Sequence, residues 1–117
     1  MSEFRKQLKT ITNNILEKRM KVYELTISKK DLVRKNEEIK FYMKEKVLYA
    51  VDDKGKALYS NQAKRDKALK DLLEEDEIYN VNSKSIEDTD LLLKLLEIEL
   101  EALKYDFKIE EILTRVI

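Results

Sequence analysis

Apolar residues recur every three or four positions over the first third of the chain. They form two rows with a seven-residue spacing: Leu8, Ile15, Val22, Lys29, Asn36 and Met43, and beside them Phe4, Ile11, Lys18, Leu25, Leu32 and Ile39. Nine of these twelve positions are apolar. A repeat sustained over this length predicts one long coiled-coil helix over residues 3–46, about 65 Å from end to end.

Three members of the two rows are polar, and they have two interpretations. Lys18, Lys29 and Asn36 could set the register of the seam, because a polar group there lowers stability but penalises wrong alignments. They could instead mark places where no partner helix lies. The sequence leaves both interpretations open.

The helical pattern breaks at YAVDDKGKALYSN, residues 49–61, which contains the single glycine of a chain without proline. Short β-prone runs lie on either side of Asp52 to Lys56, and Gly55 can supply the positive φ of a tight turn. The sequence therefore predicts a small β-hairpin over residues 47–59. A two-stranded hairpin is marginal alone, so we expect it to pack against the helix ends or other subunits.

Two further helices are expected after the hairpin. Ser60 or Asn61 is a suitable N-cap for a helix over residues 61–76, with Ala68, Leu69, Leu72 and Leu73 as its buried edge. The polar segment 77–84 reads as a break in the helical pattern. Ser85 followed by Asp88 resembles a capping box, so the last helix is predicted over residues 86–116.

The last helix has more apolar residues than one partner can cover. Ile86 and the five residues Leu93, Leu96, Leu100, Leu103 and Phe107 follow a spacing of three and four, and we expect these five to form an oligomer interface. Leu92, Leu95, Ile109, Ile112, Leu113 and Val116 widen the apolar surface. A helix of this kind belongs in a bundle, so the chain is expected to form a dimer or tetramer.

These elements predict a mainly α fold in one domain, residues 1–117. The expected architecture is an antiparallel α-helical hairpin or coiled coil with the β-hairpin near its tip, assembling into a helical bundle. Charge fits this arrangement, since residues 1–50 carry a net +6 and residues 73–117 a net −8. The basic arm either pairs with the acidic arm or stays free for a nucleic-acid backbone.

Composition limits the chemistry. The chain has no cysteine and no histidine, so thiolate nucleophiles, zinc–thiolate sites and the commonest general base are excluded. It contains no glycine-rich phosphate loop or nucleophile motif, and we expect neither enzymatic activity nor a cofactor or metal site. No apolar run approaches a membrane span or a leader peptide, so a cytoplasmic protein without a membrane partner is expected.

Basic and aromatic residues gather around the predicted hairpin. The candidate contacts for a protein partner or nucleic acid are Lys44, Lys46, Tyr49, Lys54, Lys56, Tyr59, Lys64 and Arg65. Lysines that hold phosphates beside aromatic rings that stack on bases are typical of proteins that bind single strands. Alternatively, the aromatics stabilise the hairpin by cross-strand contacts and the lysines solubilise its edge.

The segment AVDDKGKALYSNQAKRDKALKDLLEED, residues 50–76, resembles segments of small helical coiled-coil proteins of bacteriophages and prophages. The resemblance is carried by the acidic turn with Gly-Lys, the Tyr-Ser-Asn run and the charged helix containing Lys-Arg. It implies an origin in a phage or mobile element, near functions in DNA recombination or replication. It supplies no site residues.

Three functional hypotheses follow. The first is a non-enzymatic homo-oligomeric coiled-coil binding or scaffold protein, an accessory factor of phage or mobile-element DNA metabolism. The second is a protein that binds single-stranded or duplex DNA through the basic helix and the hairpin tip. The third is a small inhibitor of a host enzyme or defence system.

Overall fold

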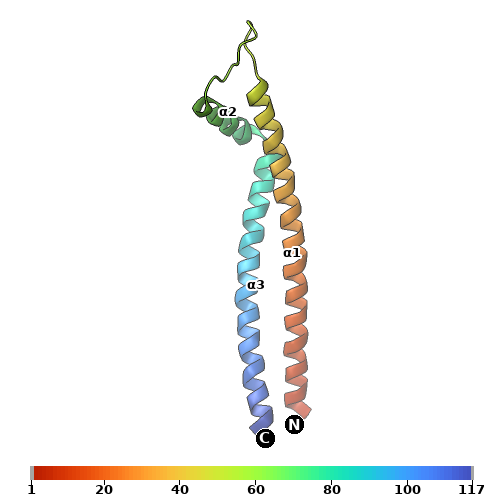
Figure 1. Cartoon of the computed structure of the whole chain (residues 1–117). Helices are drawn as coiled ribbons and strands as arrows, with labels where there is room; N and C mark the ends of the chain where they lie inside the picture. Colours follow the sequence, from red (N-terminus) through yellow and green to blue (C-terminus); the bar gives the residue numbers. More distant parts are fainter. Residues whose placement is uncertain (1, 117) are drawn as a thin grey trace. The chain divides into compact units, whose positions relative to one another are not determined.

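The computed structural model describes residues 2–116, which form three helices: α1 (Ser2–Tyr49), α2 (Gln62–Glu75) and α3 (Glu77–Val116) (Figure 1). Two of them are long, at 48 and 40 residues, because no proline and no glycine interrupts them. The prediction of a mainly α fold is confirmed. Contacts divide the chain into unit 1, residues up to 28 and from 88 onward, and unit 2, residues 29–87.

Unit 1 is a pair of helices. The first half of α1 and the second half of α3 lie side by side and run in opposite directions (Figure 1). Lys18 of α1 forms an ion pair with Glu99 of α3. With its amide nitrogen turned toward α3, Gln7 donates to Glu110 at 2.8 Å. These two contacts fix an antiparallel register, and this unit has the helical-hairpin arrangement that was predicted.

The heptad rows of α1 coincide with its less exposed positions. In unit 1 the row members Phe4, Leu8, Ile11, Ile15, Lys18, Val22 and Leu25 are all half-buried, while most of their neighbours are exposed. The rows therefore lie on the side of α1 that packs against α3, the only other helix of this unit.

Unit 2 contains the most buried side chains of the described residues. They are Val47 from α1, Ala68 and Leu73 from α2, and the polar Asn36 from α1. Leu69 and Leu72 are half-buried beside them. The buried edge predicted for the second helix is confirmed, as is Asn61 as its N-cap, since the Asn61 side chain accepts from the backbone N–H of Lys64.

Asn36 joins α1 to the first turns of α3 inside unit 2. Its side-chain nitrogen donates to the carbonyl of Tyr79 at 3.2 Å and to Ser83 Oγ at 3.1 Å, and its oxygen accepts from Asn82 at 3.0 Å. A buried amide with all these partners is satisfied in one alignment and unsatisfied in others. Of the two interpretations of the polar seam residues, the structure supports register setting for Asn36.

The first helix ends later than predicted, at Tyr49 instead of residue 46. Val47 to Tyr49, assigned to a strand, are helical. Val47 follows Met43 by four residues on the buried side of α1 and is only 4% exposed. Burial at a helical position thus outweighs the β propensity of Val47, as is usual for short apolar runs.

The β-hairpin over residues 47–59 does not form as predicted. One isolated bridge joins Val51 and Ala57, and the described residues contain no β-strand. Three backbone hydrogen bonds hold the turn, from the N–H of Asp52 to Lys56, of Gly55 to Asp52 and of Leu58 to Ala50. Val51 and Leu58 remain exposed, so no core covers this segment, and a two-stranded hairpin without such packing is marginal in water.

The break predicted over residues 77–84 is also wrong, because α3 begins at Glu77 and Ser85 lies inside it. Asp76 alone separates α2 from α3. Its carboxylate accepts from the N–H of Tyr79, and its own N–H donates to the carbonyl of Leu73. Asn80 donates to the carbonyls of Leu73, Glu74 and Asp76. These bonds satisfy groups that a helix end leaves unpaired, so no loop is needed.

Replacing Asn36 with alanine should lower the free energy of unfolding by about 1–3 kcal/mol, because the partly buried amide of Asn82 loses its acceptor. Urea denaturation followed by circular dichroism measures this. Asn13→Ala is the matched control, since Asn13 is an exposed residue of the same helix, and we expect a change within about 0.5 kcal/mol. Equal effects of the two substitutions would contradict a role for Asn36 in the register.

Candidate interaction surfaces

The five residues predicted as an oligomer interface lie on one side of α3 in unit 1. Leu93, Leu96, Leu100, Leu103 and Phe107, called the inner seam below, are all half-buried. Among the described residues of this unit α1 is the one other helix, so we infer that α1 covers them. Within one chain these residues lie in the helix pair, and a contact between chains through them stays a prediction.

A second apolar row runs along the same part of α3. The outer stripe consists of eight positions: Leu91, Leu95, Ile98, Ala102, Tyr105, Ile109, Ile112 and Val116. Its spacing alternates four and three without interruption, which is a coiled-coil repeat of nearly four heptads. All eight residues are exposed, and the seven large ones have exposed fractions between 50% and 78%.

The outer stripe points away from the inner seam. At about 100° per residue, the centres of the two rows lie about 150° apart around the helix. A single neighbouring helix cannot cover both. Leu92 and Leu113, 48% and 40% exposed, border the outer stripe on one edge. The excess of apolar residues was predicted from the sequence, but four members that complete the period were not: Leu91, Ile98, Ala102 and Tyr105.

The α1 helix of unit 1 has a shorter exposed row. Leu16, Met20, Tyr23 and Ile27 follow the same four-three spacing, with exposed fractions of 53%, 65%, 68% and 49%. The row spans less than two heptads. Polar residues continue it at Lys9 and Asn13, so it is half as long as the outer stripe of α3.

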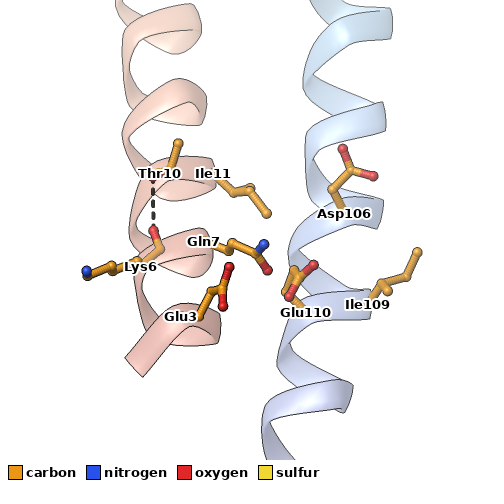
Figure 2. A pocket seen from close by; sticks show the side chains of 8 residues that line it. All are labelled: Glu3, Lys6, Gln7, Thr10, Ile11, Asp106, Ile109 and Glu110. Carbon is orange, nitrogen blue, oxygen red and sulfur yellow. Dashed lines mark hydrogen bonds between the residues drawn. The ribbon is translucent and has the colours of Figure 1, made fainter. Parts of the chain in front are cut away.

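A groove of about 450 Å³ lies between α1 and α3 near the chain ends of unit 1 (Figure 2). Its lining residues are Glu3, Lys6, Gln7, Thr10, Ile11, Asp106, Ile109 and Glu110. Figure 2 shows the amide of Gln7 and the carboxylate of Glu110 meeting across it. The groove is where the inner seam ends, since Glu110 occupies the position that continues the row of Leu96 and Leu103.

All eight predicted contact residues around the turn belong to unit 2. Lys44, Lys46 and Tyr49 lie in the last turns of α1, Lys54 and Lys56 in the turn itself, and Lys64 and Arg65 at the start of α2. Tyr59, before α2, is half-buried. The Lys46 ammonium lies 5.6 Å from the centre of the Tyr42 ring, within range of a cation–π contact.

Among the described residues, the basic side chains of this group have no acidic partner. Within residues 2–116, none of Lys44, Lys46, Lys54, Lys56, Lys64 and Arg65 forms an ion pair. Lys44 and Arg65 line one groove of about 360 Å³ between α1 and α2. Asp66 also lines it, and its carboxylate accepts a hydrogen bond from Gln62. The cations are therefore available to an anionic ligand.

A well-defined turn positions Lys54 and Lys56. The carboxylate oxygen Oδ1 of Asp52 accepts from the backbone N–H of Lys54 at 2.8 Å and of Lys56 at 3.0 Å. Gly55 has a φ of +77°, as its place in the turn predicted. Apart from Gly55 and its two chain neighbours, no heavy atom lies within 4 Å of the position that a Cβ would take there, so glycine is required by the backbone conformation and not by lack of space.

Near the middle of α1, other charged residues of unit 2 are paired with one another. Asp31 pairs with Arg34 at 2.8 Å and with Lys35 at 3.0 Å, and Arg34 also reaches Glu38. The hydrogen bonds from Arg34 and Lys35 hold the pKa of the Asp31 carboxyl below its usual value. Asp31 itself raises the pKa of the Arg34 guanidinium. These neighbouring charges satisfy one another on the surface of a single helix.

In the described part of the chain, no three His, Cys, Asp or Glu residues gather closely enough to hold a metal ion. The helices over the same residues include none with the length and apolarity that crossing a bilayer requires.

Comparisons of the chain with protein-family models, with curated proteins and with solved structures found no match. The resemblance to phage coiled-coil proteins therefore stays a prediction, and the surfaces above are interpreted from their own chemistry.

Gly55→Val should disrupt the turn and leave the helices intact, because a β-branched residue at positive φ is strained by about 1–2 kcal/mol. We expect faster hydrogen exchange at the amides of Asp52 and Leu58, with an unchanged helical circular-dichroism signal. Gly55→Asn is the matched control, since asparagine tolerates this conformation. Loss of the helical signal in the valine variant would show that the turn is part of the folding core.

Proposed function

We propose that this protein is a non-enzymatic coiled-coil scaffold that self-associates through the outer stripe of α3. The observation that carries the proposal is the exposed apolar row itself, eight positions long and unbroken. Soluble monomers rarely expose a contiguous apolar surface of this kind, and such surfaces mark protein interfaces. Fully burying a large aliphatic side chain contributes about 1.5–3 kcal/mol, so the six aliphatic residues of the stripe, together with Tyr105, favour association.

Unit 1 has a second reason to associate. None of its described residues is buried, since the four buried residues all belong to unit 2. In a pair of helices, each seam residue is covered on one side only and stays partly exposed to water. A further helix laid on α3 adds a second layer of apolar contacts, which is how helical bundles gain stability.

A second candidate function is binding to a nucleic-acid backbone through unit 2. Its support is the group of six basic side chains that form no ion pair in the described residues. In unit 1 Lys18 is paired with Glu99, while Lys9 and Lys21 form no ion pair within residues 2–116. Tyr42 and Tyr49 are exposed, the Lys46 ammonium lies over the Tyr42 ring, and bases stack on aromatic rings of this kind.

Both candidates suit an accessory factor of phage or mobile-element DNA metabolism, the setting that the sequence resemblance implies. A scaffold that also binds phosphate backbones would bring copies of itself to one nucleic-acid strand. The third hypothesis, an inhibitor of a host enzyme or defence system, remains a prediction without a particular contact to favour it.

The self-association proposal predicts that Ile98→Glu with Ile109→Glu yields a particle with the mass of one chain. Both side chains are exposed in the single chain, at 63% and 55%, so helical content should persist while buried unpaired charge opposes assembly. Light scattering coupled to size exclusion measures the mass. Asn13→Glu with Asn14→Glu adds the same charge at exposed positions of α1 and should leave the oligomer intact. A wild-type mass of one chain at micromolar concentration would rule the proposal out.

The nucleic-acid candidate predicts weaker binding when Lys54 and Lys56 are both replaced with glutamate. Losing two phosphate contacts should reduce the slope of log affinity against log salt by about two, which titrations of a fluorescent single strand at several salt concentrations can measure. Lys9→Glu with Lys21→Glu makes the same change of charge in unit 1. If that control weakens binding equally, net charge alone explains the affinity.

A further inference from the structure

The outer stripe reads the same in both directions. Its intervals are four, three, four, three, four, three and four residues. When two copies of α3 run in opposite directions, the eight positions therefore meet one another in full. Leu91 faces Val116 of the second copy, Leu95 faces Ile112, Ile98 faces Ile109, and Ala102 faces Tyr105.

Side-chain volume favours this antiparallel pairing. Ala102 is the smallest member of the stripe and Tyr105 the largest. In the antiparallel pair each Tyr105 lies on Ala102 of the second copy, at the two central layers. A parallel pair in register would instead oppose alanine to alanine and tyrosine to tyrosine, which leaves a void beside a crowded layer. Large against small fills the space at the density of protein interiors.

The edges of the stripe contribute smaller effects. In the antiparallel pair Glu101 faces Lys108 of the second copy, and this attractive contact occurs twice next to the centre. Leu92 faces Leu113 on the other edge, which extends the apolar contact. Both leucines are about half exposed in the single chain, so each has surface left to bury.

Other edge charges oppose the pairing. Lys94 faces Arg115 of the second copy, and Glu99 faces Asp106, so each contact sets like charges together. A parallel pair would bring Lys94 to Glu99 instead. Exposed charge pairs contribute little and are screened by salt, whereas a badly packed apolar layer costs more. Packing therefore decides the orientation.

The length of the stripe also selects its occupant. From Leu91 to Val116 it runs about 38 Å along the helix, and a seam of this length buries on the order of 800 Å² per chain, the size of a stable interface. The exposed row of α1, from Leu16 to Ile27, would cover only half of it. A second copy of the outer stripe covers it completely.

We propose that two copies of the chain pair antiparallel through their outer stripes, with a two-fold axis between residues 103 and 104 of α3. This inference rests on the proposed function and deepens it by naming the partner surface and its direction. A two-fold contact of this kind is closed, so it yields a dimer and leaves no outer stripe open for further growth.

Cysteine cross-linking tests the direction directly, since the chain has no cysteine of its own. Ile98→Cys and Ile109→Cys, refolded together and oxidised, should form a disulfide between position 98 of one copy and 109 of the other. Ile98→Cys alone should not cross-link, because its two copies lie eleven positions apart in the antiparallel pair, about 16 Å and beyond the reach of a disulfide. Lys104→Cys, exposed and away from the stripe, controls for random collisions.

A volume exchange gives a second test. Ala102→Leu should weaken dimerisation at least about tenfold by crowding the central layers, whereas in a parallel pair it would fill a void and strengthen it. Adding Tyr105→Ala places a small side chain opposite the new leucine at position 102, and this double substitution should recover most of the affinity. Sedimentation equilibrium measures both.

The outcomes separate the two proposals. A wild-type mass of one chain overturns both the scaffold function and the pairing. A mass above one chain with efficient cross-linking of Ile98→Cys alone keeps the self-association and overturns the antiparallel direction. A mass above two chains in the wild type overturns the closed dimer. Mixed 98–109 disulfides with rescue by the volume exchange support the pairing as stated.

Discussion

A pair of helices can hide one face of each member, and α3 has two apolar faces. Because the inner seam takes up the face toward α1, the outer stripe is left exposed in the single chain. The low burial of the side chains in unit 1 has the same cause. Its seam residues are half-buried and none is fully buried, as expected of two helices without a third layer. Association with a second chain would bury the outer stripe, as proposed above.

Unit 2 contains a third helix and therefore buries apolar side chains within one chain. Here α2 adds a third helix, and Val47, Ala68 and Leu73 become buried. The side chain of Asn36 forms hydrogen bonds with groups of α3. These bonds restrict the alignment of α1 with α3 and leave the Asn36 amide paired. Basic residues stay at the surface around the turn. The unit with the buried residues is thus the one that contains α2, and unit 1, without a third helix, is the one that carries the outer stripe.

Periodicity allowed much of this to be predicted from the sequence. The heptad rows of α1, the N-cap at Asn61 and the positive φ of Gly55 depend on residues close in the chain, and each was predicted correctly. The errors lie where distant contacts decide. Val47 is helical because it is buried, and residues 77–84 are helical because Asp76 and Asn80 satisfy the helix ends. The division of apolar residues between the inner seam and the outer stripe required knowing which side of α3 packs against α1.

Asp76 ends one helix and begins the next, and this shared residue makes the two ends dependent on each other. If the last turn of α2 opens, Asp76 loses its bond to Leu73, and Asn80 loses two of its three carbonyl partners. The first turn of α3 then loses part of its side-chain support and keeps the bonds from the Tyr79 N–H to the Asp76 carboxylate and from Asn80 to the Asp76 carbonyl. Fraying at this corner is therefore a cooperative event, and the amide protons on both sides should exchange with solvent at a common rate. A longer loop would have let each helix open by itself.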